Sequence, residues 1–391
     1  MDERIRVVEF ADLVNAQDFI DTIVRGADPE RFEVGVCVRS EESNIATPVY
    51  GDDTRRWLIP GTARSDWPRT AWRLSRLLRE WDAHILHTHH YDQAVIGWMA
   101  TRLYKRTRLV VGRHYSDAIY RSSTGVRRRA LLALEQKVNR AARRIIVPSS
   151  MIREILVRRQ GIDARKIDLI HYGFAPEKYT TPQESEVRKL RAELASGGDF
   201  LLATFARLHE EKGHRYLVEA MSELKREVPG IRWLIVGEGP ERASIERQIG
   251  EAGLTDVVRL LGWRRDAMTI MAAADIVVQP TLQEAFSQTM VEALWMATPL
   301  VITDVSGAPD IITSEENGML VPRGDSAALG RAVLRLARDP SLRARLAAAG
   351  RAYVEERLSI ERNIKLYQEA FLRAMSDDDA ARPSAPSRDK L

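Results

Sequence analysis

Apolar positions fall into short runs along most of the chain, and these runs alternate with longer stretches in which apolar residues recur three or four positions apart. A short apolar run is typical of a buried strand, whereas the longer spacing is typical of an amphipathic helix. Their alternation predicts right-handed strand–helix–strand units and parallel sheets. The predicted strands are 5–10, 33–38, 84–89, 109–112, 144–149 and 167–172 in the first half of the chain, and 200–206, 232–237, 257–262, 275–280, 299–303 and 318–322 in the second.

The alternation is interrupted once, between Pro176 and Asp199, where no apolar run occurs and two glycines come near the end. Such a stretch is typical of a linker. We therefore predict an α/β protein of two tandem domains with parallel sheets, with the ligand site in the cleft between them. Residues 326–374 are predicted to be helical throughout. The predicted parts are an N-terminal domain (1–180), a linker (181–198), a C-terminal domain (199–357), a C-terminal helix that returns to the first domain (358–375) and a disordered tail (376–391).

Composition narrows the class of protein. The chain has 391 residues, of which 45% are hydrophobic and 29% are charged, and this balance excludes disorder as the main state. No apolar run approaches the roughly 18 residues of a membrane-spanning helix, and the first residues carry acids where a signal peptide would be basic. Cys37 is the only cysteine, which excludes an intrachain disulfide and a thiolate metal cluster. We expect a cytoplasmic protein.

Charge is distributed unevenly along the chain. Residues 100–150 contain 13 Lys and Arg against two acids, Asp117 and Glu135. A basic segment at 102–144 suits an anionic partner, either a membrane surface, a phosphorylated substrate or nucleic acid. The alternative is a solvated surface on arginine-rich helices. Nucleic acid is not expected, because the segment has no stripe of stacking aromatics and no recognisable DNA-binding motif.

Two cations follow the first predicted strand of the second half. Arg207 and Lys212 lie in the loop of the segment ARLHEEKGH, just before a predicted helix. Cations beside a helix N-terminus make an anion site, because backbone N–H groups and the helix dipole add to their charge. Arginine binds a phosphate through two parallel hydrogen bonds, and lysine adds a mobile charge. The alternative is an ordinary surface loop in which Glu210 and Glu211 neutralise both cations.

A second candidate lies in residues 281–307. Glu284 stands in a loop after a predicted strand, and Ser287 is a predicted N-cap for a helix that runs to about Met296. Glu292 falls in the second turn among apolar residues, where a carboxylate needs partners. The two hydroxyls of a ribose would satisfy it, and the alternative is a solvent-facing acid. The turn at Gly237 permits close backbone approach to a nucleotide, although a plain turn would look the same.

These segments together resemble the family-four glycosyltransferases, a large retaining family with the GT-B fold. The resemblance implies two Rossmann-like domains whose parallel sheets face each other across a cleft. The resemblance runs from about Arg6 to Phe371 and is densest between Phe205 and Pro322. The family's hallmark is a pair of glutamates with seven residues between them, and Glu284 and Glu292 have that spacing. The segments GEGPER, LLGW, EAFSQTMVEA, SGAPDII and NGMLVP also occur in the family's order.

The resemblance implies transfer of a sugar from a nucleotide-diphospho sugar, with UDP favoured and GDP second, to a sugar, glycolipid or small-molecule acceptor. It implies that the C-terminal domain binds the nucleotide sugar, and that neither a metal nor another cofactor takes part. By resemblance, Arg207 and Lys212 bind the donor pyrophosphate. Glu292 binds the ribose, and Glu284 contacts hydroxyls of the donor sugar. Backbone or amide contacts to the donor come from Gly237, Phe286, Ser287 and Gln288. The alternatives are a GT-B protein that binds nucleotide sugar without transferring it, and a sugar-nucleotide epimerase of the same fold.

Histidines follow two predicted strands of the first domain. By resemblance, His114 faces the donor sugar and joins Glu284, Arg207 and Lys212 in the catalytic set, while His90 contacts the acceptor. Asn15 stands near the place of the family's Gly-Gly turn, and the resemblance implies that it too lies on the acceptor side. A metal cluster of His87, His89, His90 and His114 is not expected, and the plainer alternative is packed, hydrogen-bonded histidines. The family's lipid-linked acceptors also permit peripheral contact of 102–144 with an anionic membrane.

Overall fold

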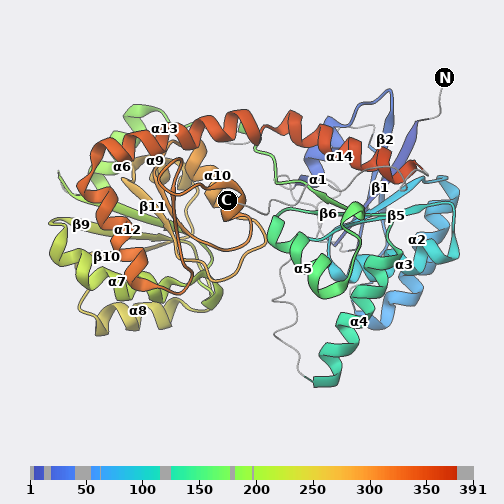
Figure 1. Ribbon diagram of the computed structural model, residues 1–391, viewed down its shortest axis with the longest axis horizontal. Coiled ribbons are helices and arrows are strands. Elements are labelled where there is room, and N and C mark those ends of the chain that lie inside the picture. The colour runs from blue at the N-terminus through green and yellow to red at the C-terminus, as the bar shows by residue number, and fades with distance from the viewer. Residues whose placement is uncertain are drawn as a thin grey trace. The chain divides into compact units, whose positions relative to one another are not determined.

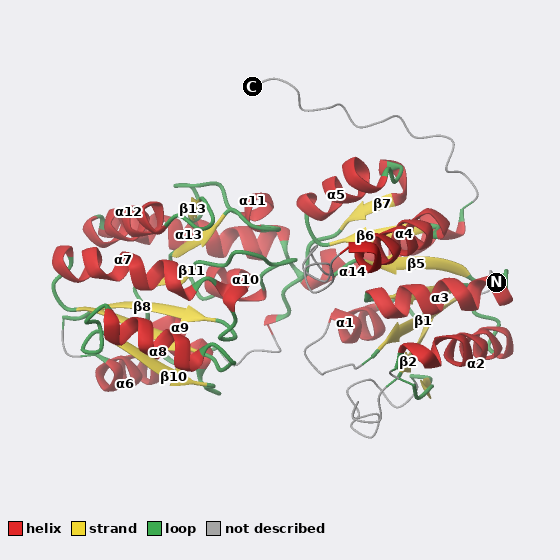
Figure 2. Ribbon diagram, turned by 90° about the horizontal axis from the view of Figure 1, so that it is seen from below, coloured by secondary structure: helices red, strands yellow, loops and turns green. Residues whose placement is uncertain are grey.

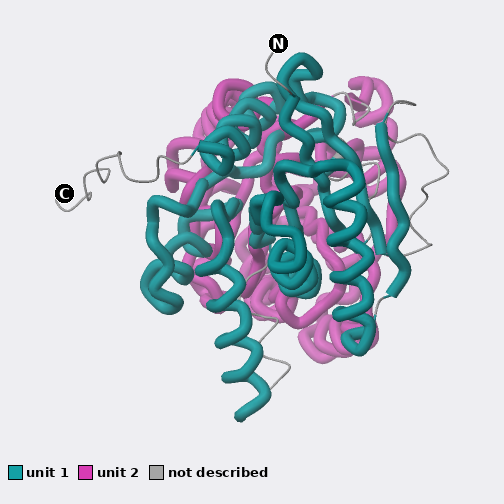
Figure 3. The backbone as a smooth tube through the Cα atoms, turned by 90° about the vertical axis from the view of Figure 1, so that its right-hand side faces the viewer, with its two compact units in different colours: residues 1–173, 360–391 teal, residues 174–359 magenta. Residues whose placement is uncertain are grey.

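The computed structural model describes residues 4–12, 19–39, 54–61, 63–114, 125–176, 181–195 and 198–376. They form two compact units (Figure 3). Unit 1 contains the described residues up to Gly173 together with those from Ile360 onward, and unit 2 is Phe174–Ser359. Asn15 and the predicted tail beyond residue 376 lie outside the described residues.

Unit 1 is built on a parallel sheet, in which the described residues supply seven strands in the order β3-β2-β1-β4-β5-β6-β7. Helices cover both faces of this sheet (Figure 1, Figure 2). The strands are β1 (Ile5–Ala11), β2 (Phe32–Val38), β3 (Arg56–Leu58), β4 (Ile85–Thr88), β5 (Arg108–Gly112), β6 (Arg144–Val147) and β7 (Ile167–Leu169). The helices are α1 (Phe19–Gly26), α2 (Trp67–Glu80), α3 (Tyr91–Leu103), α4 (Gly125–Ala141), α5 (Ser150–Gln160) and α14 (Ile360–Met375).

Unit 2 repeats this plan with six described strands, in the order β10-β9-β8-β11-β12-β13. Each sheet reverses its strand order next to the first strand of the unit, and ligands bind α/β sheets at such a point. The strands are β8 (Phe200–Phe205), β9 (Ile231–Val236), β10 (Val258–Gly262), β11 (Ile276–Gln279), β12 (Leu300–Thr303) and β13 (Met319–Val321). The helices are α6 (Glu184–Leu194), α7 (His214–Glu227), α8 (Arg242–Glu251), α9 (Ala267–Ala273), α10 (Gln288–Trp295), α11 (Ala308–Ile311), α12 (Ser326–Arg338) and α13 (Pro340–Arg357).

All twelve predicted strands are confirmed to within three residues at either end. The sequence missed β3, whose three residues are too short to make an apolar run. The segment 326–374 is helical as predicted except at two short breaks, Asp339 and residues 358–359, which separate α12, α13 and α14. The first break is at Asp339, whose carboxylate caps α13 by accepting a hydrogen bond from the Leu342 N–H at 2.9 Å. Pro340, with no N–H to donate, begins the next helix.

The segment predicted as a linker contains α6, which packs beside α9 in unit 2. Leu190 and Leu194 are buried on its inner face. Arg191 donates a hydrogen bond to the Asp275 carboxylate at 2.8 Å. Residues 184–194 are therefore part of unit 2 rather than a spacer.

Candidate functional site

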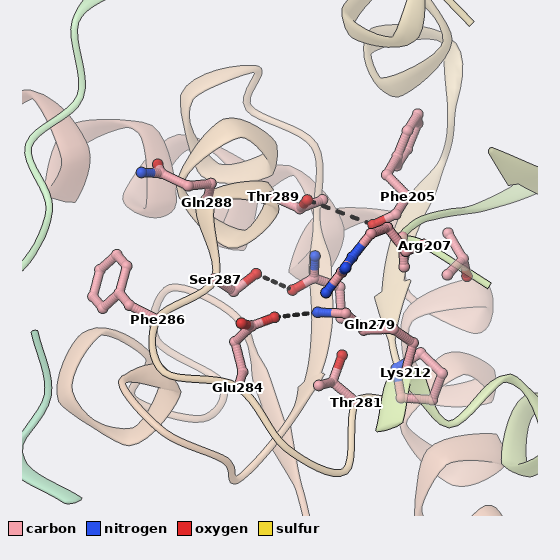
Figure 4. Close-up of a pocket in the computed structure, with 13 residues that line it drawn as sticks. Phe205, Arg207, Lys212, Gln279, Thr281, Glu284, Phe286, Ser287, Gln288 and Thr289 are labelled. Atoms are coloured by element: carbon pink, nitrogen blue, oxygen red, sulfur yellow. Dashed lines mark hydrogen bonds and ion pairs between the residues drawn. The ribbon is translucent and has the colours of Figure 1, made fainter. Parts of the chain in front are cut away.

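A cavity of about 280 Å³ lies in unit 2 at the edge where β8 and β11 end (Figure 4). These strands are neighbours, with Val277 in register with Ala203, so the residues that follow each strand reach the same edge of the sheet. The cavity brings together six of the predicted donor-site residues: Arg207, Lys212, Glu284, Phe286, Ser287 and Gln288. Thr289, the next residue of the predicted helix start, also lines it. Residues that the sequence did not single out complete the lining: Thr204, Phe205, Ala206, Gln279, Pro280 and Thr281.

The N-terminus of α10 forms part of the lining. Ser287 is confirmed as its N-cap, because the hydroxyl accepts a hydrogen bond from the Met290 N–H at 3.1 Å. The same hydroxyl donates to the buried Gln279 side chain at 2.9 Å, which holds the helix start against β11. The first N–H groups of a helix have no acceptor within the helix. Those of Gln288 and Thr289 therefore lie where they can bind an anion or a hydroxyl in the cavity.

Lys212 and Glu284 form an ion pair across the cavity (Figure 4). Their side chains are only 14% and 26% exposed, so water screens this pair less than one on the open surface. Two loops must meet to form the pair. Gly213, in the left-handed region at φ +68°, makes this possible because a Cβ there would lie 2.0 Å from the Pro280 carbonyl oxygen. The Leu282 N–H then donates to the Glu211 carbonyl at 2.8 Å and ties the loops together.

Arg207 lies at the rim of the cavity. Its side chain is 70% exposed and lies 3.6 Å from the Glu211 carboxylate. An exposed pair of this kind contributes about 0–1 kcal/mol, so a ligand phosphate can compete for the guanidinium at small cost. Each cation of the predicted anion site therefore has a carboxylate neighbour in the structure, Glu211 for Arg207 and Glu284 for Lys212. A ligand phosphate would have to replace both.

Two predicted residues do not line the cavity. Glu292 is half-buried on α10, one turn beyond Gln288 on the same face of the helix. Gly237 adopts φ +140°, and a Cβ there would lie 1.9 Å from the Ala206 carbonyl oxygen. The structure thus explains Gly237 by the close approach of the chain's own backbone, which positions the loop carrying Arg207.

The predicted histidines of unit 1 follow β4 and β5. His90 is exposed and occupies the N-cap position of α3. His114 lies two residues beyond β5 and is partly exposed. Its Nδ1 is 2.8 Å from the Tyr172 hydroxyl, and its Nε2 is 3.4 Å from His89 Nδ1. Burial, followed by the neighbouring His89, holds the pKa of His114 well below its usual value.

The sequence did not predict Glu9, a fully buried carboxylate within β1. Its Oε2 lies 2.6 Å from His89 Nε2 and 2.9 Å from His87 Nδ1. The signal was available, because an acid inside the apolar run IRVVEF must find a partner once the strand is buried. The sequence does not contain the identity of that partner, because it depends on the pairing of β1 with β4.

The basic segment 102–144 is less exposed than its composition suggests. Arg113 is buried and donates to Glu135 at 3.2 Å, and Arg144 is buried in a two-fold hydrogen bond to Asp168. These two arginines cannot meet an outside partner. Other basic residues of the segment are exposed, among them those at the start of α4, where Val126 and residues 127–130 are open to solvent. Among the described helices, none combines the length and the apolar character that crossing a bilayer requires.

Comparison with known proteins agrees with this architecture. Residues 16–178 match the model of "Glycosyltransferase Family 4", and residues 186–353 match that of "Glycosyl transferases group 1". The chain is 28% identical over 294 residues to the 2-deoxystreptamine glucosyltransferase of Streptomyces kanamyceticus, covering 73% of this chain and 76% of that one. It is 31% identical over 187 residues to the lipopolysaccharide core biosynthesis glycosyltransferase LpsD of Rhizobium meliloti, covering 48% and 53%.

The fold matches solved structures, among them the lipopolysaccharide outer core galactosyltransferase WaaB, at a TM-score of 0.73 and 14% identity, covering 94% of this chain and 99% of that one. The Anabaena protein Alr3699/HepE, solved with UDP, superposes with a TM-score of 0.80 at 20% identity, covering 95% of this chain and all of that one. The same protein has been solved with UDP-glucose. The two family models together span most of this chain, and both units have the parallel α/β architecture of these structures. The protein therefore belongs to the family-four glycosyltransferases, with the GT-B fold.

Proposed function

We propose that the protein transfers a sugar from a nucleotide-diphospho sugar to a hydroxyl of a sugar, glycolipid or small-molecule acceptor, with retention of the anomeric configuration. A UDP-sugar is the favoured donor and a GDP-sugar the second. The observation that carries the proposal is the cavity where Arg207, Lys212 and the start of α10 converge. The UDP and UDP-glucose complexes of the Anabaena protein support the donor class. The similarity to the 2-deoxystreptamine glucosyltransferase supports a small-molecule acceptor.

In this proposal the Lys212–Glu284 pair is exchanged when the donor binds. A donor phosphate replaces Glu284 as the partner of Lys212, and Arg207 binds a second phosphate oxygen. Glu284 is then available to accept hydrogen bonds from hydroxyls of the donor sugar. The bond between the anomeric carbon and the phosphate oxygen breaks as the acceptor oxygen bonds to the same face of that carbon, and the leaving phosphate takes the acceptor proton. The cations and the helix N-terminus stabilise the charge that develops on this phosphate.

The remaining predicted residues support this reaction from further away. Glu292 holds the ribose hydroxyls, and His114 faces the donor sugar. His90 and Asn15 are on the acceptor side. No metal ion is required, because Arg207, Lys212 and the α10 N–H groups supply positive charge at the diphosphate. Transfer is therefore expected to persist in EDTA.

The proposal is tested by calorimetric titration with UDP, GDP and ADP, followed by transfer assays with the corresponding sugar donors in EDTA. We expect UDP to bind most tightly, and the anomeric configuration of the product, read by NMR, to equal that of the donor. An inverted product would contradict the retaining mechanism, and loss of transfer in EDTA with recovery in magnesium would contradict the metal-free one. Nucleotide binding without transfer would favour the non-catalytic alternative, and release of an altered sugar without acceptor would favour the epimerase.

We also propose that the start of α4 attaches the protein to the inner face of an anionic membrane. Arg127, Arg128 and Arg129 are exposed there beside Val126, which is 81% exposed. The residues of α4 that are fully buried, Glu135, Val138 and Asn139, all lie in its second half. The first half therefore presents three cations and an apolar residue to solvent, which suits the surface of an anionic bilayer.

Replacing Arg127, Arg128 and Arg129 by alanine is expected to abolish flotation with anionic vesicles. Each cation near such a surface contributes about 1 kcal/mol, so three together change the partition about 100-fold. The matched control replaces the exposed α2 residues Arg69, Arg73 and Arg79 by alanine, which removes the same charge from another helix. Equal loss in both triple variants would indicate net charge alone. Absence of flotation in the unaltered protein would indicate that it acts without the membrane.

A further inference from the structure

A column of polar side chains is buried on one face of the unit 1 sheet. Glu9 of β1 is in register with His87 of β4, and His89 is two residues further along, on the same face. The apolar residues that precede them on that face, Val7 and Ile85, pack against α14. Glu9, His87 and His89 are at most 1% exposed. A polar group so deeply buried needs partners within the protein.

Glu9 is the charged end of this column. Burial alone would raise the pKa of the Glu9 carboxyl, but the neighbouring His87 and His89 lower it to about 2. Burial, with a smaller contribution from His87, lowers the pKa of His89 to about 4. Near neutral pH, Glu9 is therefore an anion and His89 is a neutral imidazole. A carboxylate can only accept, so the hydrogen bond of 2.6 Å fixes the proton of His89 on Nε2.

The position of this proton determines what His89 offers to His114. With its proton on Nε2, His89 presents the lone pair of Nδ1, and His114 Nε2 lies 3.4 Å from it. On the other side, the Tyr172 hydroxyl lies 2.8 Å from His114 Nδ1 and can donate to it. Both neighbours thus favour the same form of His114, with the proton on Nε2 and a lone pair on Nδ1. Its depressed pKa keeps it neutral.

A metal ion is the rival interpretation of the same cluster. His87, His89 and His114 each offer one nitrogen, and these nitrogens lie within 4.8 Å of one another. The two nitrogens of His89, however, face opposite partners, Glu9 and His114. A directed chain of hydrogen bonds accounts for both contacts without an ion, so the metal becomes an outcome of the test.

We propose that Glu9 and His89 are positioning residues that hold His114 as the Nε2–H tautomer, a hydrogen-bond donor toward an oxygen of the bound sugar. The separation of 3.4 Å from His89 is long for a hydrogen bond, so the same N–H can pass to a nearer ligand oxygen. The titratable groups that act on His114 include His87, His89 and His90 at the end of β4 and Tyr172 after β7. Glu9 on β1 reaches His114 through its hydrogen bond with His89. The ligand role of His114 rests on the proposed function, whereas the choice of tautomer does not.

The test is nitrogen NMR of the free protein with labelled histidine. The chain has eight histidines, and a His114→Asn variant assigns the signal. We expect His114 to show a protonated Nε2 and an unprotonated Nδ1 near neutral pH. Glu9→Gln removes the charge but keeps the shape, so His89 and His114 should then populate both tautomers. Because Glu9 is buried and its variant could fold poorly, Tyr172→Phe gives a second test from the partly exposed end, and it too should mix the tautomers.

Asp168→Asn is the matched control. It converts another buried carboxylate of unit 1, paired with Arg144, to an amide. It should lower the stability of unit 1 and leave the His114 tautomer unchanged. In transfer assays, Glu9→Gln should lower kcat at least about 10-fold with little change in nucleotide affinity. At an analogous carboxylate–histidine pair, replacing the carboxylate by an amide gives the wrong histidine tautomer and lowers kcat roughly 10⁴-fold.

Three results would overturn the positioning role: a protonated Nδ1 on His114 in the unaltered protein, an unchanged tautomer in both variants, or stoichiometric zinc in the purified protein with histidine signals that shift when it is chelated. If the tautomers behave as expected but no nucleotide binds, the positioning role stands and the proposed function fails. If transfer occurs and Glu9→Gln does not change it, the proposed function stands and this inference fails.

Discussion

Replacing Lys212 by alanine is expected to lower kcat roughly 100-fold or more, since removal of one preorganised group that stabilises developing charge has effects of this size. Affinity for UDP should fall roughly 10- to 100-fold, the value of a charge-assisted hydrogen bond. The fold should persist, because Lys212 lies at the end of a one-turn 3-10 helix between β8 and α7, and its ion pair with Glu284 borders a cavity rather than the core. Calorimetric titration and initial rates measure the two effects.

Three controls separate the role of Lys212 from a general loss of charge. Lys225→Ala removes another lysine of unit 2 that forms a pair with a carboxylate, Asp256 at 2.7 Å, and it should leave both kcat and UDP affinity unchanged. Uridine, which lacks phosphates, should bind the Lys212→Ala variant as well as it binds the unaltered protein. Glu292→Gln, unlike Lys212→Ala, should bind uridine more weakly than the unaltered protein does. Unchanged UDP affinity in Lys212→Ala would remove Lys212 from the diphosphate site.

The parts of this site that could be predicted from sequence are those determined locally. Ser287 was predictable as an N-cap because the cap bonds to a residue three positions along the chain. The break at Asp339 was equally readable, since an acid before a proline is typical of a helix start. It was missed because the apolar pattern of α12 runs on into α13.

The parts that could not be predicted depend on which strands and loops become neighbours. Lys212 and Glu284 are 72 positions apart, and their pairing requires Gly213 to fit against Pro280. The partners of Glu9 likewise follow from the register of β1 with β4. Charge composition misled for the same reason. Arg144 counted toward the basic segment that suits an anionic partner, yet it is buried with Asp168, which also accepts a hydrogen bond from Arg373 of α14 at 3.1 Å.

Acidification from neutral pH to about pH 5 is expected to destabilise both units, because each buries histidines in the neutral form. Burial, with a smaller contribution from Lys212, lowers the pKa of His214 in unit 2 to about 4. The pKa of His89 in unit 1 is also lowered to about 4. In the unfolded chain these groups titrate near 6.5. Between these values the unfolded state binds more protons, so the free energy of unfolding falls as pH falls. For His214 alone the loss is about 2 kcal/mol at about pH 5.

Urea unfolding at neutral pH and at about pH 5, followed by circular dichroism, measures this loss. His214→Leu provides the test, since neither ring nitrogen of His214 has a hydrogen-bond partner among the described residues and the side chain is 3% exposed. The variant should lose about 2 kcal/mol of the pH dependence and keep its stability at neutral pH. Glu9 affects stability in a separate pH range. Because its pKa is lowered in the folded state, its contribution to the free energy of unfolding is complete above about pH 4.5 and is lost only as pH falls toward 2. A variant that retains the full loss between neutral pH and pH 5 would show that His214 is not the group that takes up the proton, because Glu9 does not titrate in that interval.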